Sequence, residues 1–456
     1  MKDNNKKEKE KGKKDDKADS LNNENKNEIK IEINDNYINI NEEIEENKNE
    51  IIIEDNKISK EDKKFFKISF ADFKSHYDNC ESAIKNDVKN FKSMNNLPNN
   101  RHLLWLLFLG ILPYKSNKDW SRIISDERTS YHEDKKKLIT KDIEDFIITK
   151  KIKDKYALYF KFKEILPKED YDYLDIIKVD VTRTFQKIEL FQQENIQKAL
   201  VNILFIFAKN NKEIGYRQGM SDLCAIFLYV IYRKKKLDPG FIDDNISLLF
   251  YLLYSNNEFL ESDAYSLFSK FMLKGHINFF LYNDEKFQNG QLSMIESKNR
   301  IHLKKEDILK SKDSDLKKRM FLVYYHEFPL VDKDLYKFMV DKIDPEIFMV
   351  RWYLCNFSRE FPLPELLKFW DLILYQQFLE DNKKKKSKNI EENKFFIFSD
   401  YIVLSMLINI KALIMKKKTS SELMAFLMKF PKNIELKNIY LKALEIYNKN
   451  KNNIKI

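Results

Sequence analysis

The chain has 456 residues, of which 43% are hydrophobic and 34% charged, so it can bury a large core and still carry polar, unpacked segments. It contains only 7 glycines and 9 prolines, and this scarcity argues against all-β folds, which use both residues at many turns. The net charge of +10 arises from 82 basic residues mixed with 72 acidic ones, which favours a solvated surface over a nucleic-acid-binding one.

Several classes of protein lack their marker patterns in this sequence. The three cysteines have no metal-ligand spacing, and their small, odd number suits a reducing compartment. The charged N-terminus carries no signal peptide, and the longest apolar stretches, 103–112 and 223–232, are shorter than the roughly 18 residues of a membrane-spanning helix. Glycine-rich phosphate loops, zinc-protease motifs and nucleophile elbows are also missing from the sequence. We therefore predict a soluble, cytosolic protein without a metal site or a nucleotide site of its own.

The chain is expected to begin with a disordered tail and then to become helical. Residues 1–60 are mainly Lys, Asp, Glu and Asn, with too little apolar surface to offset the entropy of ordering. Helical patterns begin near Phe70 and continue to about Phe91. Residues 103–110 are then apolar on nearly every face, as in a helix that is buried all round, and Gly110 ends that helix.

The strongest helical patterns lie in the middle of the chain. Residues 114–170 are charged and amphipathic. Residues 195–208 are apolar on two faces, so we place this helix at the centre of the core. Residues 220–231 match the helical period in full, and two more helices are expected near 246–253 and 264–272.

Polar segments interrupt the second half of the chain. Residues 283–318 and 376–396 are rich in lysine and lack an apolar period, so we predict two insertions that loop out of the fold. Between them, Asp344 and Pro345 form a typical helix start, a capping residue followed by proline. Three further helices are expected near 399–416, 420–429 and 433–448.

No segment is convincing as a strand and no repeat is visible, so the predicted fold class is all-α. The expected organisation is the tail at 1–60, one domain over 61–430, and a C-terminal helix and tail over 431–456. The motifs described next lie within residues 95–430 of that domain.

Two short motifs in the middle of the chain contain residues that could act on a phosphate. Asp180 and Arg183 are three residues apart, so on a helix the carboxylate can hold a guanidinium that presents a planar fork of donors. Gln218 lies between Tyr216 and Gly219, and the glycine permits a sharp turn that exposes the glutamine. Spacing alone favours the plainer alternatives, a local ion pair and a loop glutamine.

Four segments, in order, resemble the signature motifs of TBC domains, the GTPase-activating domains for Rab GTPases. These segments are Arg101-x-x-x-Trp105 with Gly110, Ile177-x-x-Asp180-x-x-Arg183-Thr184, Tyr216-x-Gln218-Gly219-Met220, and Arg351-Trp352 followed by Phe357-x-Arg359-Glu360-Phe361 and Trp370-Asp371. Four ordered motifs are far more specific than any one alone. The fuller strings 180–185, 191–195 and 326–364 are most similar to the subfamily of TBC domain family member five.

The resemblance implies that the protein accelerates GTP hydrolysis by a Rab-family small GTPase in its GTP form, using two fingers. Arg183 would stabilise charge in the transition state, Gln218 would position the attacking water, and Asp180 would hold the loop or the arginine in place. The neighbouring motif residues would support them: Thr184, Tyr216, Gly219 and Met220. Magnesium and GTP would come with the GTPase, so no cofactor of the protein's own is expected.

The remaining motif residues are expected to be mainly structural: Arg101, Trp105, Arg351, Trp352, Arg359, Glu360, Trp370 and Asp371. A buried Arg–Glu pair beside aromatic rings usually locks helices together. The apolar helix at 195–208 would set the distance between the two fingers.

Other functional hypotheses remain. The protein could be a TBC-fold adaptor that binds a Rab or a trafficking coat without accelerating hydrolysis. A third hypothesis, a basic helical protein that binds nucleic acid, predicts an affinity for DNA or RNA that depends steeply on salt. The subfamily resemblance implies endosomal Rabs, a retromer-type coat as partner, and recruitment from the cytoplasm to endosomal membranes. The sequence does not determine which Rab is the substrate or whether the lysine-rich segments contact a membrane directly.

Overall fold

A computed structural model describes residues 101–113, 118–148, 161–233, 253, 257–283, 295, 297–384 and 396–453. Every regular element in these ranges is a helix, which confirms the all-α prediction. The expected tail at 1–60 and the helical patterns before residue 91 lie outside the described residues, as does nearly all of the helix expected near 246–253.

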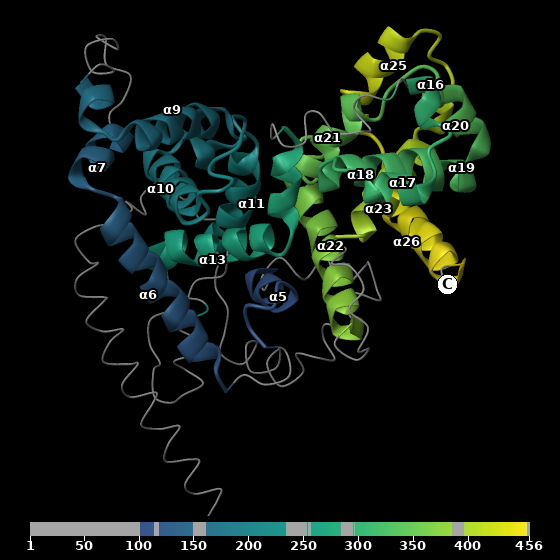
Figure 1. Ribbon diagram of the computed structural model, residues 1–456. Coiled ribbons are helices and arrows are strands. Elements are labelled where there is room, and N and C mark those ends of the chain that lie inside the picture. The colour runs from purple at the N-terminus through teal and green to yellow at the C-terminus, as the bar shows by residue number, and fades with distance from the viewer. Residues whose placement is uncertain are drawn as a thin grey trace, which may run out of the picture.

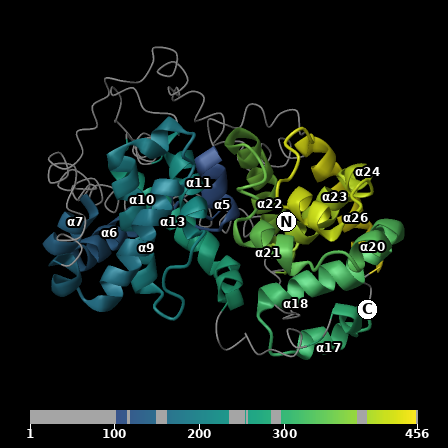
Figure 2. The same cartoon turned by 90° about the horizontal axis from the view of Figure 1, so that it is seen from above.

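The helices form two groups that lie side by side in both views (Figures 1 and 2). The N-terminal group consists of α5 (Arg101–Phe108), α6 (Trp120–Leu138), α7 (Lys141–Ile148), α9 (Lys168–Arg183), η3 (Glu189–Gln192), α10 (Glu194–Asn210), α11 (Met220–Tyr232), η4 (Asn257–Phe259) and α13 (Leu260–Leu273). The segment η5 (His276–Asn283) contacts α13 of this group and α18 and α21 of the other. The C-terminal group consists of α16 (Ser297–Arg300), α17 (Lys305–Lys310), α18 (Asp315–Phe321), η6 (Leu322–Glu327), α19 (Phe328–Val331), α20 (Lys333–Val340), α21 (Glu346–Leu354), α22 (Leu363–Lys384), α23 (Phe398–Asn409), α24 (Lys411–Ile414), α25 (Ser420–Leu427) and α26 (Leu436–Asn453).

Helix α10 lies at the centre of the N-terminal group, as its two apolar faces predicted. All residues from Ala199 to Ala208 are buried, and the helix packs against α9, α11 and α13. Helix α9 precedes α10 in the chain and α11 follows it. Because both pack against α10, the two candidate motifs, at the end of α9 and before the start of α11, lie on neighbouring elements.

A buried polar contact joins α5 to α22 and so links the two groups of helices. The Nε atom of Arg101 donates to both carboxylate oxygens of Asp371 at 3.0 and 3.1 Å, and the indole nitrogen of Trp105 donates to the same carboxylate at 2.7 Å. Trp105 also stacks on Trp370 with 5.8 Å between ring centroids. Arg101 and Trp105 of the first motif therefore form a single buried cluster with Trp370 and Asp371 of the last motif.

The structure corrects the prediction that 283–318 loops out of the fold. Its described part forms α16, α17 and α18, and Ile308 and Leu316 are fully buried. Each of these helices has seven residues or fewer, so each carries too few apolar positions for a period to show in the sequence. The N-terminus of α18 is capped by Ser314, whose Oγ accepts a hydrogen bond from the backbone of Lys317.

The second expected insertion is also corrected in part, because α22 continues through residues 376–384. Gln376 and Gln377 are buried there, and the Gln377 side chain donates to Asp381 at 2.6 Å and accepts from the backbone of Phe396 at 2.6 Å. The glutamines gave the segment a polar composition, but their hydrogen bonds allow burial.

The helix starts and ends later in the chain agree with the predictions to within a few residues. Asp344 accepts a hydrogen bond from the backbone of Glu346 at 2.9 Å, at the expected start of α21. The helix expected at 399–416 is divided at Ile410 into α23 and α24. Helix α26 packs against α23, and the Ser405 hydroxyl donates to the backbone carbonyl of Ile439 at 2.6 Å, so this C-terminal helix shares the core with α23.

A buried histidine between the groups makes stability depend on pH. His276 is 1% exposed and its Nε2 bonds to the carbonyl of Leu354 at 2.9 Å. Burial lowers the pKa of His276 to about 4, assisted by the charge of Arg319 and opposed by the bond to Leu354. The unfolded chain therefore takes up a proton below pH 6.5 that the folded chain refuses until about pH 4.

We predict that this histidine costs about 2 kcal/mol of folding free energy when the pH falls from 7 to 5. Denaturant unfolding at both pH values measures the loss. In His276→Gln, which keeps a donor for Leu354, the loss should be smaller by that amount, whereas exposed His302→Gln should behave like the unmodified protein. An equal pH dependence in all three proteins would contradict the assignment.

Candidate functional site

Arg183 is the last residue of α9 and is exposed. The helix ends there because Thr184 is extended and its hydroxyl donates back to the carbonyl of Asp180 at 2.9 Å. Phe185 then adopts a φ of +42°, which turns the chain away from the helix axis. Thr184 is buried at 1% exposure, so the backbone below Arg183 is fixed while the guanidinium extends into solvent.

Gln218 lies in the tight turn that precedes α11 and is also exposed. Gly219 has a φ of +100°, a conformation that disfavours any residue with a Cβ atom. The backbone of Met220 donates to the carbonyl of Arg217 at 3.2 Å, and the fully buried Met220 side chain fixes the turn to the core. The predicted sharp turn with an exposed glutamine is therefore present.

Asp180 and Tyr216 connect the two motifs directly. The Tyr216 hydroxyl donates to the Asp180 carboxylate at 2.8 Å across 36 residues of sequence, and both side chains are buried. The expected ion pair between Asp180 and Arg183 does not form, because the carboxylate points inward to the tyrosine. Of the two roles considered for Asp180, holding the loop and holding the arginine, the geometry matches the first.

The charges around Asp180 come from all sides of the site. Burial raises the pKa of Asp180, and the Asp222 charge adds to this effect. The hydrogen bond from Tyr216 and the charges of Arg183 and Arg359 act in the opposite direction. Burial and the Asp180 charge raise the pKa of Tyr216 well above its usual value, so the tyrosine remains a donor.

Arg359 differs from its predicted interior role. Its side chain is 47% exposed, and its Nε donates to Asp222 in the first turn of α11 at 2.8 Å. Glu360 pairs with Arg351 instead, at 2.7 and 2.9 Å, and is buried as the motif predicted. Nothing in the sequence connects Arg359 with Asp222, which lies 137 residues away, so sequence reasoning missed Asp222 and this contact.

The other expected structural residues lie away from this surface. Trp352 is fully buried and packs edge-on against Phe348 and Phe430, with 5.1 and 5.8 Å between ring centroids. Trp105, Trp370 and their polar partners form the α5–α22 cluster described above. The structure thus brings Asp180 and Tyr216 into contact between the motifs of Arg183 and Gln218, and places the tryptophans of the structural motifs in the core.

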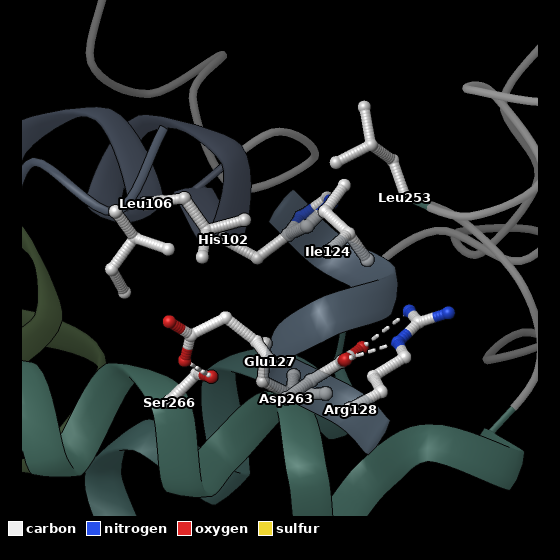
Figure 3. Close-up of a pocket in the computed structure, with 10 residues that line it drawn as sticks. His102, Leu106, Ile124, Glu127, Arg128, Leu253, Asp263 and Ser266 are labelled. Carbon is white, nitrogen blue, oxygen red and sulfur yellow. Dashed lines mark hydrogen bonds and ion pairs between the residues drawn. The ribbon is translucent and has the colours of Figure 1, made fainter. Parts of the chain in front are cut away.

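A small cavity of about 30 Å³ lies elsewhere, between α5, α6 and α13 (Figure 3). Its wall includes two polar contacts, Arg128 with Asp263 at 2.8 Å and the Ser266 hydroxyl with Glu127 at 2.5 Å. The volume is enough for one or two water molecules. None of the candidate motif residues lines this cavity, so it is separate from the candidate site.

Gly215 fixes the distance between the Gln218 turn and α9. It has a φ of +62°, and a Cβ at this position would lie 2.4 Å from the Tyr173 hydroxyl and 2.8–2.9 Å from ring atoms of Tyr173. Gly110 has a similar φ of +74° but nothing within 4 Å of the same position. An alanine would therefore have a strained backbone at either position, but it would clash with a neighbouring side chain only at Gly215.

We predict that Gly215→Ala displaces the Gln218 turn and destabilises the protein more than Gly110→Ala, which should cost only about 1–2 kcal/mol of backbone strain. Denaturant unfolding of the two variants measures the difference. Adding Tyr173→Ala to Gly215→Ala should recover most of the excess, because it removes the atoms that clash. Equal losses in the two single variants would refute the contact.

The arrangement defines an all-helical protein with an exposed arginine and an exposed glutamine on motifs that a buried hydrogen bond joins. The sequence matches the family described as the Rab-GTPase-TBC domain over residues 98–304 and 299–415, which together span more than half of the chain. The chain therefore belongs to the RabGAP-TBC family, as the four motifs indicated.

Individual members of the family are similar to this chain over different parts of its length. TBC1 domain family member 5 of Mus musculus is 27% identical over 365 residues, covering 75% of this chain and 40% of its own length, and the Homo sapiens protein is also 27% identical. The GTPase-activating protein GYP1 of Saccharomyces cerevisiae is 25% identical over 202 residues, or 43% of this chain. The chain thus spans about two fifths of the length of the mouse and human relatives.

The fold is shared with a solved structure, the Ypt/Rab-GAP domain of Gyp1p. The TM-score is 0.54 and the match covers 80% of this chain and 94% of that domain, with 17% of residues identical. At this level of identity the likeness shows a shared fold. No helix in the described part of the chain is long and apolar enough to cross a membrane.

Proposed function

We propose that this protein accelerates GTP hydrolysis by a Rab-family GTPase in its GTP form, with Arg183 and Gln218 acting together in the partner's active site. The observation that supports this proposal most directly is the Tyr216–Asp180 hydrogen bond, which ties the Gln218 turn to the last turn of the helix that ends in Arg183. Both proposed fingers are exposed while the residues that link them are buried.

Each residue would have a distinct role in the reaction. Arg183 would donate hydrogen bonds to the γ-phosphate oxygens, where charge accumulates in the transition state. Gln218 would orient the attacking water through its amide, in place of the GTPase's own glutamine. Asp180 and Tyr216 would keep the two loops in register, and Thr184, Gly219 and Met220 would fix their backbones.

No cofactor of the protein's own is needed for this activity. The Rab would bring magnesium and GTP, so the protein contributes only a guanidinium and an amide. The relationship to TBC1 domain family member 5 supports a further proposal that the protein acts in vesicle trafficking, is recruited from the cytoplasm to endosomal membranes, and binds a retromer-type coat. Pull-down from a cell lysate tests the coat: capture of a retromer subunit is expected, and its absence would oppose this part of the proposal.

The test of the activity is GTP hydrolysis by a panel of purified Rab proteins with and without this protein. We expect at least one Rab to respond and Gln218→Ala to reduce the response by about 10²-fold, as misplacement of a reacting group does. Exposed Gln186→Ala, in the loop after α9, is the matched control and should leave the rate unchanged. A Rab that responds equally to the unmodified protein and to Gln218→Ala would contradict the role of the glutamine.

The alternative is a catalytically silent adaptor with the same fold. It would bind a GTP-form Rab, or a trafficking coat, without changing the rate of hydrolysis. Binding of a Rab without acceleration would favour this alternative, whereas the exposure of Arg183 and Gln218 favours catalysis.

A further inference from the structure

The Gln218 turn lies where the two groups of helices meet. A Cβ at Gly219 would be 3.7 Å from the sulfur of Cys355 and 3.8 Å from the ring of Phe280. Cys355 follows α21 in the C-terminal group and is 4% exposed. The segment after α21 therefore lies directly against the turn that carries Gln218.

That segment has an unusual and well-anchored backbone. Asn356 and Phe357 have φ angles of +42° and +65°, a left-handed pair that costs about 1–3 kcal/mol per residue and is common at functional sites. The strain is held by buried contacts, because the Trp370 indole donates to the carbonyl of Asn356 at 3.0 Å. Glu360 is fixed by its pair with Arg351. Arg359 is thus an exposed residue on a rigid support.

Arg359 crosses from this segment to α11. Its Nε donates to Asp222, which lies four residues after Gln218 in the first turn of the helix. This is the hydrogen bond that its guanidinium makes within the described part of the chain, and the side chain is 47% exposed beside the site. The charges of Arg359 and Arg183 both lower the pKa of the Asp180 carboxyl, against the larger effect of its burial.

An exposed ion pair of this kind contributes little to stability, typically below about 1 kcal/mol. A role in holding the fold together therefore does not account for a strained, buried scaffold that presents one arginine. The position of the Arg359–Asp222 bond does account for this scaffold, because the bond holds the first turn of α11, which follows directly after Gln218.

We propose that Arg359 is a positioning residue that holds Gln218 in its active geometry by binding Asp222 at the start of α11. The inference rests on the proposed function and extends it: the C-terminal group of helices, which carries neither finger, would control the glutamine finger through this one contact. Arg183 is placed by α9 and would be affected little.

The first test measures the kinetics of Rab GTP hydrolysis. Arg359→Ala should lower kcat by up to about fivefold, the largest change that loss of one exposed ion pair can cause, while KM for the Rab changes less than about twofold. Arg359→Lys should retain part of the activity, since it keeps a donor for Asp222. Arg122→Ala, which removes an exposed arginine paired with Asp119 and Asp126 on α6, is the control and should have no effect.

A double-mutant cycle identifies the partner. Asp222→Ala should lower kcat as much as Arg359→Ala, and the double variant should be no worse than either single one, because both remove the same bond. If the losses of kcat in the two single variants multiplied in the double variant, Arg359 would act independently of Asp222, and the proposal would be overturned. A rise in KM at unchanged kcat would also overturn it, since it would make Arg359 a docking residue.

The second test requires no GTPase and separates this inference from the proposed function. Amide hydrogen exchange in the free protein should become faster over residues 216–223 in Arg359→Ala and stay unchanged in α10. If no Rab responds to the unmodified protein, the proposed function fails and the exchange measurement alone decides the positioning role. Unchanged exchange over 216–223 would overturn it.

Discussion

Replacement of Arg183 by lysine is expected to abolish measurable acceleration of GTP hydrolysis, a loss on the order of 10³- to 10⁵-fold. Lysine keeps the positive charge but replaces a planar fork of donors by a single ammonium, which cannot bind two phosphate oxygens in the same way. The side chain is exposed and makes no hydrogen bond or ion pair with another described residue, so the fold should not change.

The measurement is single-turnover GTP hydrolysis by the responding Rab, together with unfolding to show that stability is retained. Arg122→Lys, at an exposed position on α6 distant from the motifs, is the matched control and should keep full activity. Arg183→Lys that activates as well as the unmodified protein would remove the arginine finger from the proposed mechanism.

Removal of the Asp371 carboxylate is expected to have the largest effect on stability. In Asp371→Ala the buried guanidinium of Arg101, which is 8% exposed, and the indole N–H of Trp105 lose their shared acceptor. Breaking one partner of a buried ion pair costs about 3–5 kcal/mol, because the remaining charge stays buried without compensation. The contact joins α5 to α22, so the loss should loosen the two groups of helices together.

Denaturant unfolding measures this loss. The control is Asp126→Ala, which removes a 63% exposed aspartate paired with Arg122 at 3.1 Å and should cost less than about 1 kcal/mol. Replacing Arg101 and Asp371 together by apolar residues of similar volume should cost less than Asp371→Ala alone, since no unpaired charge remains. Similar losses for Asp371→Ala and Asp126→Ala would show that the buried cluster is not structural.

The helices of the core were predictable from the sequence because their apolar residues recur at the helical period over three or more turns. Helices α10, α11 and α13 are buried on most faces, so even their approximate ends follow from where apolar residues stop. The same reasoning failed for α16 to α18 and for the end of α22. Short helices and hydrogen-bonded glutamines leave no apolar period, although residues such as Ile308, Leu316 and Gln377 are buried.

The candidate fingers could also be found in the sequence, because Arg183 and Gln218 occur in ordered motifs that resemble those of a known family. What they contact was not predictable. Asp180 was expected to pair with the arginine beside it but bonds to Tyr216 on the next motif, because a buried carboxylate needs a buried donor.

The sequence by itself therefore determined the all-α fold class, the main helices and the identity of the candidate site residues, all of which depend on local pattern. Only the tertiary structure decided which distant residues meet: Arg101 with Asp371, Tyr216 with Asp180, and Arg359 with Asp222. These pairs are separated by 270, 36 and 137 positions, and their formation depends on how whole helices pack. Local propensity contains no information on that packing, which is why the support of Gln218 by the C-terminal helices became visible only in three dimensions.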